Sequence, residues 1–223
     1  MRIPMAAGQA WWPIRPERFR RPVLIVVEGG HDIEFLKRIS RLLHADDSRL
    51  PDLEQEATHG RVLFLPAGGA NLGPWTLSLN ALELPEVHIY DREMAPETRV
   101  RSQLVAALNA RPRCRAFVTR KRSLENYLHA SAIRKASGMT LAFGDDESVA
   151  SLAAQALYEA QPRDTLWDAL SPRARKRLRD RAKRWLNTRA VDQMTIAELK
   201  ERDREGEVTQ WFAAIGAMLR TAR

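Results

Sequence analysis

The sequence contains a single cysteine, Cys114, so an internal disulfide cannot form. One cysteine also excludes a zinc site of the cysteine-rich kind. No run of about 18 apolar residues occurs, and the N-terminal segment lacks the pattern of a signal peptide. These absences predict a protein that spans no membrane and resides in the reducing cytoplasm.

Lysine is also scarce, since only 6 of the 36 basic residues are lysines and 30 are arginines. Against 28 acidic residues, the basic residues give a formal net charge of +8. Arginine makes bidentate contacts with phosphate, so this excess favours nucleic acid or another polyanion as a partner. An arginine-rich and alanine-rich proteome would produce the same bias, and composition alone does not separate the two interpretations.

The length of 223 residues fits one domain followed by a helical extension. We divide the chain into a basic N-terminal arm (1–21), an α/β domain (22–140) and a helical C-terminal extension (141–223). The arm is irregular in pattern and contains Trp11 and Trp12. These two side chains are expected either to pack on the domain or to stack on nucleic-acid bases.

Within the α/β domain, short β-branched and apolar runs alternate with helical patterns. The first run, VLIVV at 23–27, is typical of a strand buried on both faces. The further predicted strands lie at 61–66, 87–90 and 115–119. The helical patterns between them cover about 33–43, 73–82 and 97–108. This alternation predicts a Rossmann-like α/β fold with a mostly parallel sheet flanked by helices.

After about residue 129 the sequence predicts only helices. The spacing of apolar residues, and the prolines between the helical segments, place them at 147–160, 172–188, 195–203 and 206–221.

Acidic residues stand where the predicted strands end. Glu28 follows the first strand, Asp32 lies one turn further on, and Asp91 and Glu93 follow the third strand. Positions i and i+2 of an extended chain point to the same side, so Asp91 and Glu93 are expected to point together. In open α/β sheets, sites form beyond the carboxyl ends of the strands.

Two of these acidic residues also have a simpler interpretation: Asp32 as the N-cap of a helix, and Asp91 as the start of a loop. Together, however, such carboxylates repel one another unless protons or cations compensate. Mg²⁺ binds oxygen ligands, and two such ions can stabilise both the attacking and the leaving oxygen in phosphodiester cleavage. We therefore predict one or two Mg²⁺ or Mn²⁺ ions at this sheet edge.

The acidic residues lie in two short motifs, Val27-Glu28-Gly29-Gly30-His31-Asp32 and Asp91-Arg92-Glu93. These motifs resemble those of the Toprim domain, which topoisomerases, primases and certain nucleases share. Two further segments are Ala67-Gly68-Gly69-Ala70-Asn71 and Arg122-Ser123-Leu124-Glu125-Asn126-Tyr127-Leu128. They are similar to segments of the overcoming-lysogenization-defect (OLD) family of nucleases. The resemblance covers about residues 22–130.

The resemblance implies specific roles for the residues that match the motifs. The implied metal ligands are Glu28, Asp32, Asp91, Glu93 and Glu125. Glu28, Asp91 and Glu93 would also be catalytic, and Lys121 would lie near the scissile phosphate. Glu93 departs from the family pattern, which has a second aspartate at this position.

Other departures narrow the class of protein. The chain lacks a separate strand-passage domain, and its single cysteine excludes the usual zinc-binding module of a primase. It also lacks a Walker loop. The resemblance therefore implies a stand-alone Toprim protein, acting alone or with a separately encoded ABC/SMC-like ATPase, and a homodimer.

The segment 173–189 contains nine basic residues and one acidic residue. Ala174, Leu178, Ala182 and Trp185 form an apolar stripe at helical spacing, which leaves the other faces cationic. A solvated basic helix is one interpretation, and a phosphate-binding helix is the other. For the second interpretation, the predicted nucleic-acid-binding residues are Arg173, Arg175, Lys176, Arg177, Arg179, Lys183 and Arg184.

The sequence therefore predicts a metal-dependent nuclease that cleaves DNA or RNA, and the resemblance implies a role in defence against phage or mobile DNA. Two alternatives remain open. One is a non-catalytic Toprim module with a nucleic-acid-binding or regulatory role, and the other is an RNA-processing nuclease.

Overall fold

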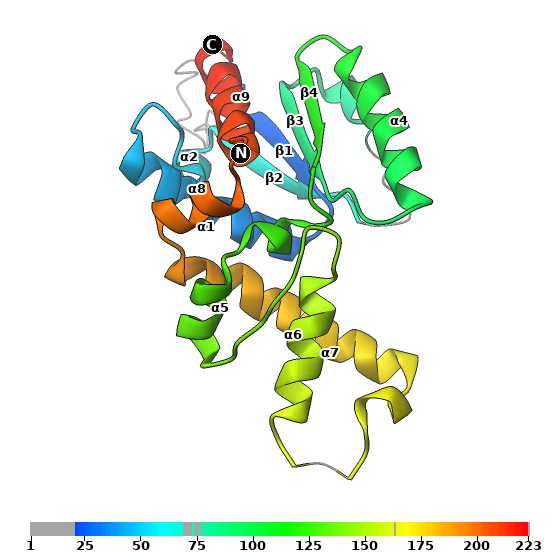
Figure 1. Ribbon diagram of the computed structural model, residues 1–223. Helices are drawn as coiled ribbons and strands as arrows, with labels where there is room; N and C mark the ends of the chain where they lie inside the picture. Colours follow the sequence, from blue (N-terminus) through cyan, green and yellow to red (C-terminus); the bar gives the residue numbers. More distant parts are fainter. Residues whose placement is uncertain (1–20, 69–72, 74–75, 77, 163, 223) are drawn as a thin grey trace, which may run out of the picture.

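A computed structural model describes residues 21–68, 73, 76, 78–162 and 164–222 (Figure 1). Almost all of the predicted basic arm lies outside the described residues, as does most of the turn at 67–71. Of the helix predicted at 73–82, the described part contains the 3₁₀ turn Leu79–Leu82.

Four parallel strands form the central sheet, which confirms the predicted α/β class. They are β1 (Val23–Val27), β2 (Val62–Pro66), β3 (Glu86–Tyr90) and β4 (Cys114–Val118). Their spatial order is β2-β1-β3-β4, and every adjacent pair is parallel. The chain moves from β1 outward to β2 and then returns to β3 on the other side. The boundary between β1 and β3 is therefore the switch point of the topology.

Alternating side chains of the strands pack into two hydrophobic layers. Val23, Ile25 and Val27 of β1 belong to the larger core, with helices α1 (Gly30–Asp46) and α9 (Glu207–Thr221). Leu24 and Val26 face the smaller core, which α4 (Glu97–Asn109) covers. Figure 1 shows α9 and α4 on opposite sides of the sheet. Both faces of β1 are buried, as its continuous apolar run predicts.

Among the described residues, the other α-helices are α2 (Leu53–Thr58), α5 (Ala130–Ser137), α6 (Val149–Glu159), α7 (Pro172–Trp185) and α8 (Ile196–Arg202). The predicted helix at 172–188 leaves α-helical geometry after Trp185 and continues as a π-helical turn, Leu186–Ala190. Helices α2 and α5 were not predicted, because they are short. Among the described residues no strand follows β4, as expected.

Packing crosses the predicted division at residue 140. Helix α9 contacts β1 and β3, and its Trp211 and Phe212 are fully buried in the larger core with β1 residues. Helices α6 and α7 pack against each other and project away from the sheet (Figure 1). The domain boundary stays a prediction, but one hydrophobic core serves both segments.

Glu198 of α8 connects that helix to α5. It accepts hydrogen bonds from Ser131 Oγ and, at 2.8 Å, from Lys135 Nζ. The Thr195 amide also donates to it, at 2.9 Å. Partial burial alone would raise the pKa of Glu198. The hydrogen bonds outweigh this effect and lower the pKa to about 2.

Replacing Glu198 with glutamine is therefore expected to destabilise the fold by about 1–2 kcal/mol at pH 7. Because the folded pKa is depressed, the stabilisation is complete above the unfolded pKa and is lost as the pH falls towards 2. Urea unfolding at pH 7 and at pH 3, with the exposed Glu97→Gln as control, measures the difference. A cost that stays constant between the two pH values would show that ionisation of Glu198 is not the cause.

Candidate metal centre

The carboxyl ends of β1 and β3 meet at the switch point of the sheet. Glu28 directly follows β1, and Asp91 directly follows β3. The Asp91 amide donates a hydrogen bond to Glu28 Oε1 at 3.1 Å, so the two strand ends are joined. The predicted meeting of these two acidic positions is therefore present in the fold.

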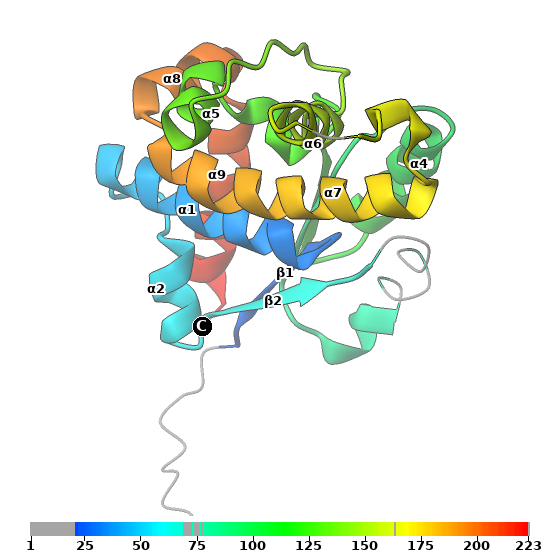
Figure 2. The ribbon, with the colours of Figure 1, turned by 90° about the horizontal axis from the view of Figure 1, so that it is seen from below.

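Three carboxylates from separate segments converge on one lysine. Asp32 lies in the first turn of α1, Asp91 follows β3, and Glu125 lies in the 3₁₀ turn Leu124–Tyr127. The Nζ atom of Lys183, in α7, lies 3.1 Å from Asp32 Oδ1 and 3.6 Å from both Asp91 Oδ2 and Glu125 Oε1. Figure 2 shows α7 passing the start of α1. We call Asp32, Asp91 and Glu125 the acidic cluster.

Backbone amides fix two of these carboxylates. Asp32 Oδ2 accepts from the Gly29 amide at 2.8 Å, and Asp91 Oδ1 accepts from the Leu124 amide at 2.9 Å. The expectation that Asp32 is an N-cap is wrong, because α1 begins at Gly30 and Asp32 is its third residue. From there its side chain bonds back to the Gly29 amide and also reaches the cluster.

Glu125 is held by a side chain that sequence reasoning missed. Asn187 Nδ2 donates to Glu125 Oε1 at 2.6 Å. Asn187 belongs to the π-helical turn that continues α7, and such turns occur frequently at functional sites. It lies four residues after Lys183, and this helical spacing is the signal that would have linked the two.

The acidic cluster is almost completely shielded from solvent. The side chains of Asp32 and Asp91 are 3% exposed, that of Glu125 is 2% exposed, and that of Lys183 is 28% exposed. Burial raises the pKa of Asp91 well above its usual value and also raises the pKa of Asp32, although Lys183 opposes both changes. Burial alone would lower the pKa of Lys183, but the three carboxylates raise it.

The chemistry of this cluster fits a divalent cation. With all groups ionised, the three carboxylates carry three negative charges and Lys183 compensates only one of them, so a divalent cation would compensate more of this charge than the lysine does. The ligand atoms are oxygens, the type that Mg²⁺ and Mn²⁺ prefer. In addition, the buried Asn187 Oδ1 has no hydrogen-bond partner among the described residues. Because the nitrogen of the same amide donates to Glu125, this unpartnered oxygen is a candidate for a further ligand.

Glu28 lies next to the acidic cluster but is ion-paired with Arg101 of α4. The guanidinium of Arg101 also donates to the Asp91 carbonyl at 2.8 Å, and burial lowers the pKa of Arg101. Glu28 is therefore already neutralised, and its role as a metal ligand stays a prediction.

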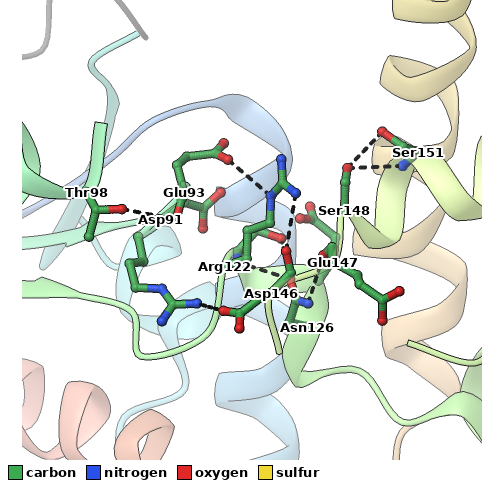
Figure 3. Close-up of polar contacts among 12 residues, drawn as sticks. Asp91, Glu93, Thr98, Arg122, Asn126, Asp146, Glu147, Ser148 and Ser151 are labelled. Carbon is green, nitrogen blue, oxygen red and sulfur yellow. Dashed lines mark hydrogen bonds and ion pairs between the residues drawn. The ribbon is translucent and has the colours of Figure 1, made fainter. Parts of the chain in front are cut away.

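Glu93 does not extend the acidic cluster in the way that the sequence argument expects. The backbone at Glu93 is left-handed (φ 54°), so the extended geometry that would align it with Asp91 ends before this residue. Its carboxylate lies 3.5 Å from Arg122 Nε, and its amide donates to the Arg122 carbonyl at 2.9 Å (Figure 3). The side chain is 37% exposed.

The two predicted basic residues nearest the site have carboxylate partners. Lys121 is ion-paired with Asp145 and lies 5.6 Å above the Tyr127 ring. Its position beside a scissile phosphate stays a prediction. Lys183 was assigned to nucleic-acid contact, whereas the structure directs its ammonium into the acidic cluster.

A second polar cluster lies at the opposite end of β3. Glu86, His88 and Cys114 are buried, and their ligand atoms lie within 4.8 Å of one another. The carboxylate of Glu86 accepts from Arg111 at 2.6 Å and contacts His88 Nε2 at 2.8 Å, while His88 Nδ1 contacts the Tyr90 hydroxyl at 2.7 Å. Burial raises the pKa of Cys114 to about 11. Each of the three groups thus has a hydrogen-bond or ion-pair partner within the protein.

Comparison with known proteins adds no family assignment. No family model matches the chain, and neither the curated proteins nor the solved structures contain a match. Among the described residues, no helix is both long and apolar enough to cross a membrane.

Proposed function

We propose that this protein is a metal-dependent nuclease that hydrolyses phosphodiester bonds in DNA or RNA. The observation that carries the proposal is the convergence of Asp32, Asp91 and Glu125 at the switch point of a parallel sheet. Three nearly buried carboxylates repel one another, and their assembly has a chemical reason if they bind a cation. The resemblance of the motifs to the Toprim domain of OLD-family nucleases supports the same function.

In this proposal Asp32, Asp91 and Glu125 hold Mg²⁺ or Mn²⁺. When bound, such an ion lowers the pKa of a coordinated water and polarises the phosphoryl group. The chain's own residues orient the ligands: the Gly29 and Leu124 amides fix Asp32 and Asp91, and Asn187 fixes Glu125. The carboxylate of Glu28 accepts a hydrogen bond from the backbone amide of Asp91 and so helps to hold Asp91 in place.

A basic surface on α7 supports nucleic acid as the substrate. The exposed side chains that form it are Arg173, Lys176, Arg177, Arg179, Arg181 and Arg184. The apolar stripe of the same helix, including Leu178, Ala182 and Trp185, packs against the larger core, as predicted. The helix thus presents cations to solvent, and Lys183 near its end contacts the acidic cluster.

Replacing both Arg177 and Arg184 with alanine is expected to weaken binding to nucleic acids of different sequence by a similar factor. The slope of log affinity against log salt should become shallower by about 2, because binding releases about one counterion fewer for each phosphate contact that is removed. Fluorescence anisotropy from 50 to 200 mM salt measures the slope, and Arg99→Ala on α4 is the control. A slope equal to that of the wild-type protein would place the nucleic acid elsewhere.

The function is tested by incubating the protein with plasmid DNA and with tRNA in Mn²⁺, in Mg²⁺ and in EDTA. We expect cleavage of at least one substrate with metal and none with EDTA. Cleavage that persists in EDTA would contradict a metal-dependent mechanism. If neither substrate is cleaved although the protein binds both, the result supports a non-catalytic binding module.

The motif resemblance also extends to partners. By that resemblance we propose a homodimer that works with a separately encoded ATPase of the ABC/SMC type in defence against phage or mobile DNA. Repeating the cleavage assay with a co-expressed candidate ATPase tests this part separately. Cleavage of equal rate with and without the ATPase would contradict it.

A further inference from the structure

The ammonium of Lys183 occupies the position that a cation bound to the acidic cluster would take. Its Nζ atom is within 3.6 Å of oxygen atoms from all three carboxylates. Two of these three distances, both 3.6 Å, exceed normal hydrogen-bond length, so those contacts are mainly electrostatic. The lysine therefore acts as a point charge between carboxylates that have no other cation within ion-pair distance among the described residues.

Lys183 is also the most exposed member of this group. Its side chain is 28% exposed, against 2–3% for the carboxylates, so it covers the cluster on the solvent side. Of the four side chains, Lys183 is therefore the one most open to an incoming cation. The adjacent residue Arg184 is exposed, and the preceding residues of α7 form the basic surface, so a released lysine joins a solvated helix face.

We propose that Lys183 is a built-in counterion that stabilises the acidic cluster until a divalent cation binds, and that the two compete for the same carboxylates. This inference rests on the proposed metal site. The ammonium supplies one positive charge, whereas a divalent cation supplies two. The distance from such a cation to a carboxylate oxygen is also shorter than the distance from an ammonium nitrogen to that oxygen. Metal binding must then move Lys183 away from Asp32, Asp91 and Glu125. The lysine thus sets how much free metal the protein needs.

Titration of Mn²⁺ into Lys183→Met tests the competition, with Lys176→Met on the exposed face of α7 as the matched control. Binding is followed by calorimetry and by the melting temperature, so no cleavage is needed. We expect the variant to melt at a lower temperature in EDTA and to show a larger rise with Mn²⁺. Its half-saturating Mn²⁺ concentration should be at least about tenfold lower than that of wild type. An unchanged or higher value would overturn the proposal.

A second measurement uses the unaltered protein and does not depend on how Lys183→Met folds. An amine-reactive reagent labels each lysine, and mass spectrometry gives the labelling rate at Lys183 and at the exposed Lys176. We expect Mn²⁺ to increase the rate at Lys183 several-fold and to leave Lys176 unchanged. An equal rate at Lys183 with and without Mn²⁺ would show that the lysine does not move.

The outcomes separate this inference from the proposed function. If wild type binds Mn²⁺ and cleaves nucleic acid, but Lys183→Met binds Mn²⁺ no more tightly, only the counterion role is wrong. If neither protein binds Mn²⁺, the metal site is wrong and both proposals fall together.

Discussion

Replacing Asp91 with asparagine is expected to reduce metal-dependent cleavage at least about 100-fold. Asp91 is the residue on which the site depends most, because it contacts four separate parts of the fold. Its amide donates to Glu28, its carbonyl accepts from Arg101, and its carboxylate accepts from the Leu124 amide and pairs with Lys183. Asparagine keeps the size of the side chain and one amide oxygen but removes the charge. Loss even of a group that only orients a metal ligand commonly costs 10–100-fold in affinity or activity.

Asp168→Asn is the matched control, because it makes the same chemical change at an exposed residue that is distant in the sequence from the acidic cluster. Initial cleavage rates are compared at saturating Mn²⁺, with circular dichroism to confirm that both variants are folded. An Asp91→Asn protein that is folded and cleaves at the wild-type rate would remove Asp91 from the mechanism. Asp91→Asn should not lose stability, since burial already raises the pKa of this carboxyl group.

Replacing Arg111 with methionine is expected to destabilise the fold by about 3–5 kcal/mol. Arg111 lies where α4 leads into β4, and its guanidinium donates to Glu86 Oε1 at 2.6 Å and to the Thr76 carbonyl at 3.1 Å. The side chain of Glu86 is only 2% exposed. Without Arg111, a buried carboxylate loses its main cationic partner, which costs far more than the loss of a surface ion pair.

Urea unfolding at neutral pH measures this change, with the exposed Arg99→Met of α4 as control. The double variant Glu86→Gln with Arg111→Met should recover part of the lost stability, because the uncompensated charge is then absent. If the double variant is as unstable as the sum of the two single variants, the ion pair is not the source of the effect.

The sheet was predictable because its signals are local. Each β-strand is a short apolar run. The prediction for β1 is exact, those for β2 and β3 differ from the structure by one residue at the first position, and that for β4 is displaced by one residue. Buried parallel strands need no long-range information to be found, since both faces require apolar side chains. The same local reasoning failed at Glu93, where a left-handed backbone turns the chain away from extended geometry.

The candidate site was predictable only in part. Glu28 and Asp91 could be placed together because both end parallel strands that adjoin the switch point. Asp32 was placed at the same edge because it lies one turn after Glu28, and Glu125 came from the motif resemblance; the structure brings both to Asp91 around Lys183. Lys183 and Asn187 could not be placed, because the position of α7 and of the π-helical turn beside α1 is decided by long-range packing of Ala182 and Leu186 in the larger core. In the sequence, Lys183 is one cation among nine in its segment.

The central claim is that Asp32, Asp91 and Glu125 form one divalent-cation site. It is tested most directly by calorimetric titration of Mn²⁺ into wild type, Asp32→Asn and Glu125→Gln, with Glu97→Gln as control. The account predicts saturable binding by wild type and by the control, and binding weakened at least about tenfold in both cluster variants. Binding of equal strength in all four proteins would place the ion elsewhere. No binding by wild type at millimolar Mn²⁺ would contradict the metal centre itself.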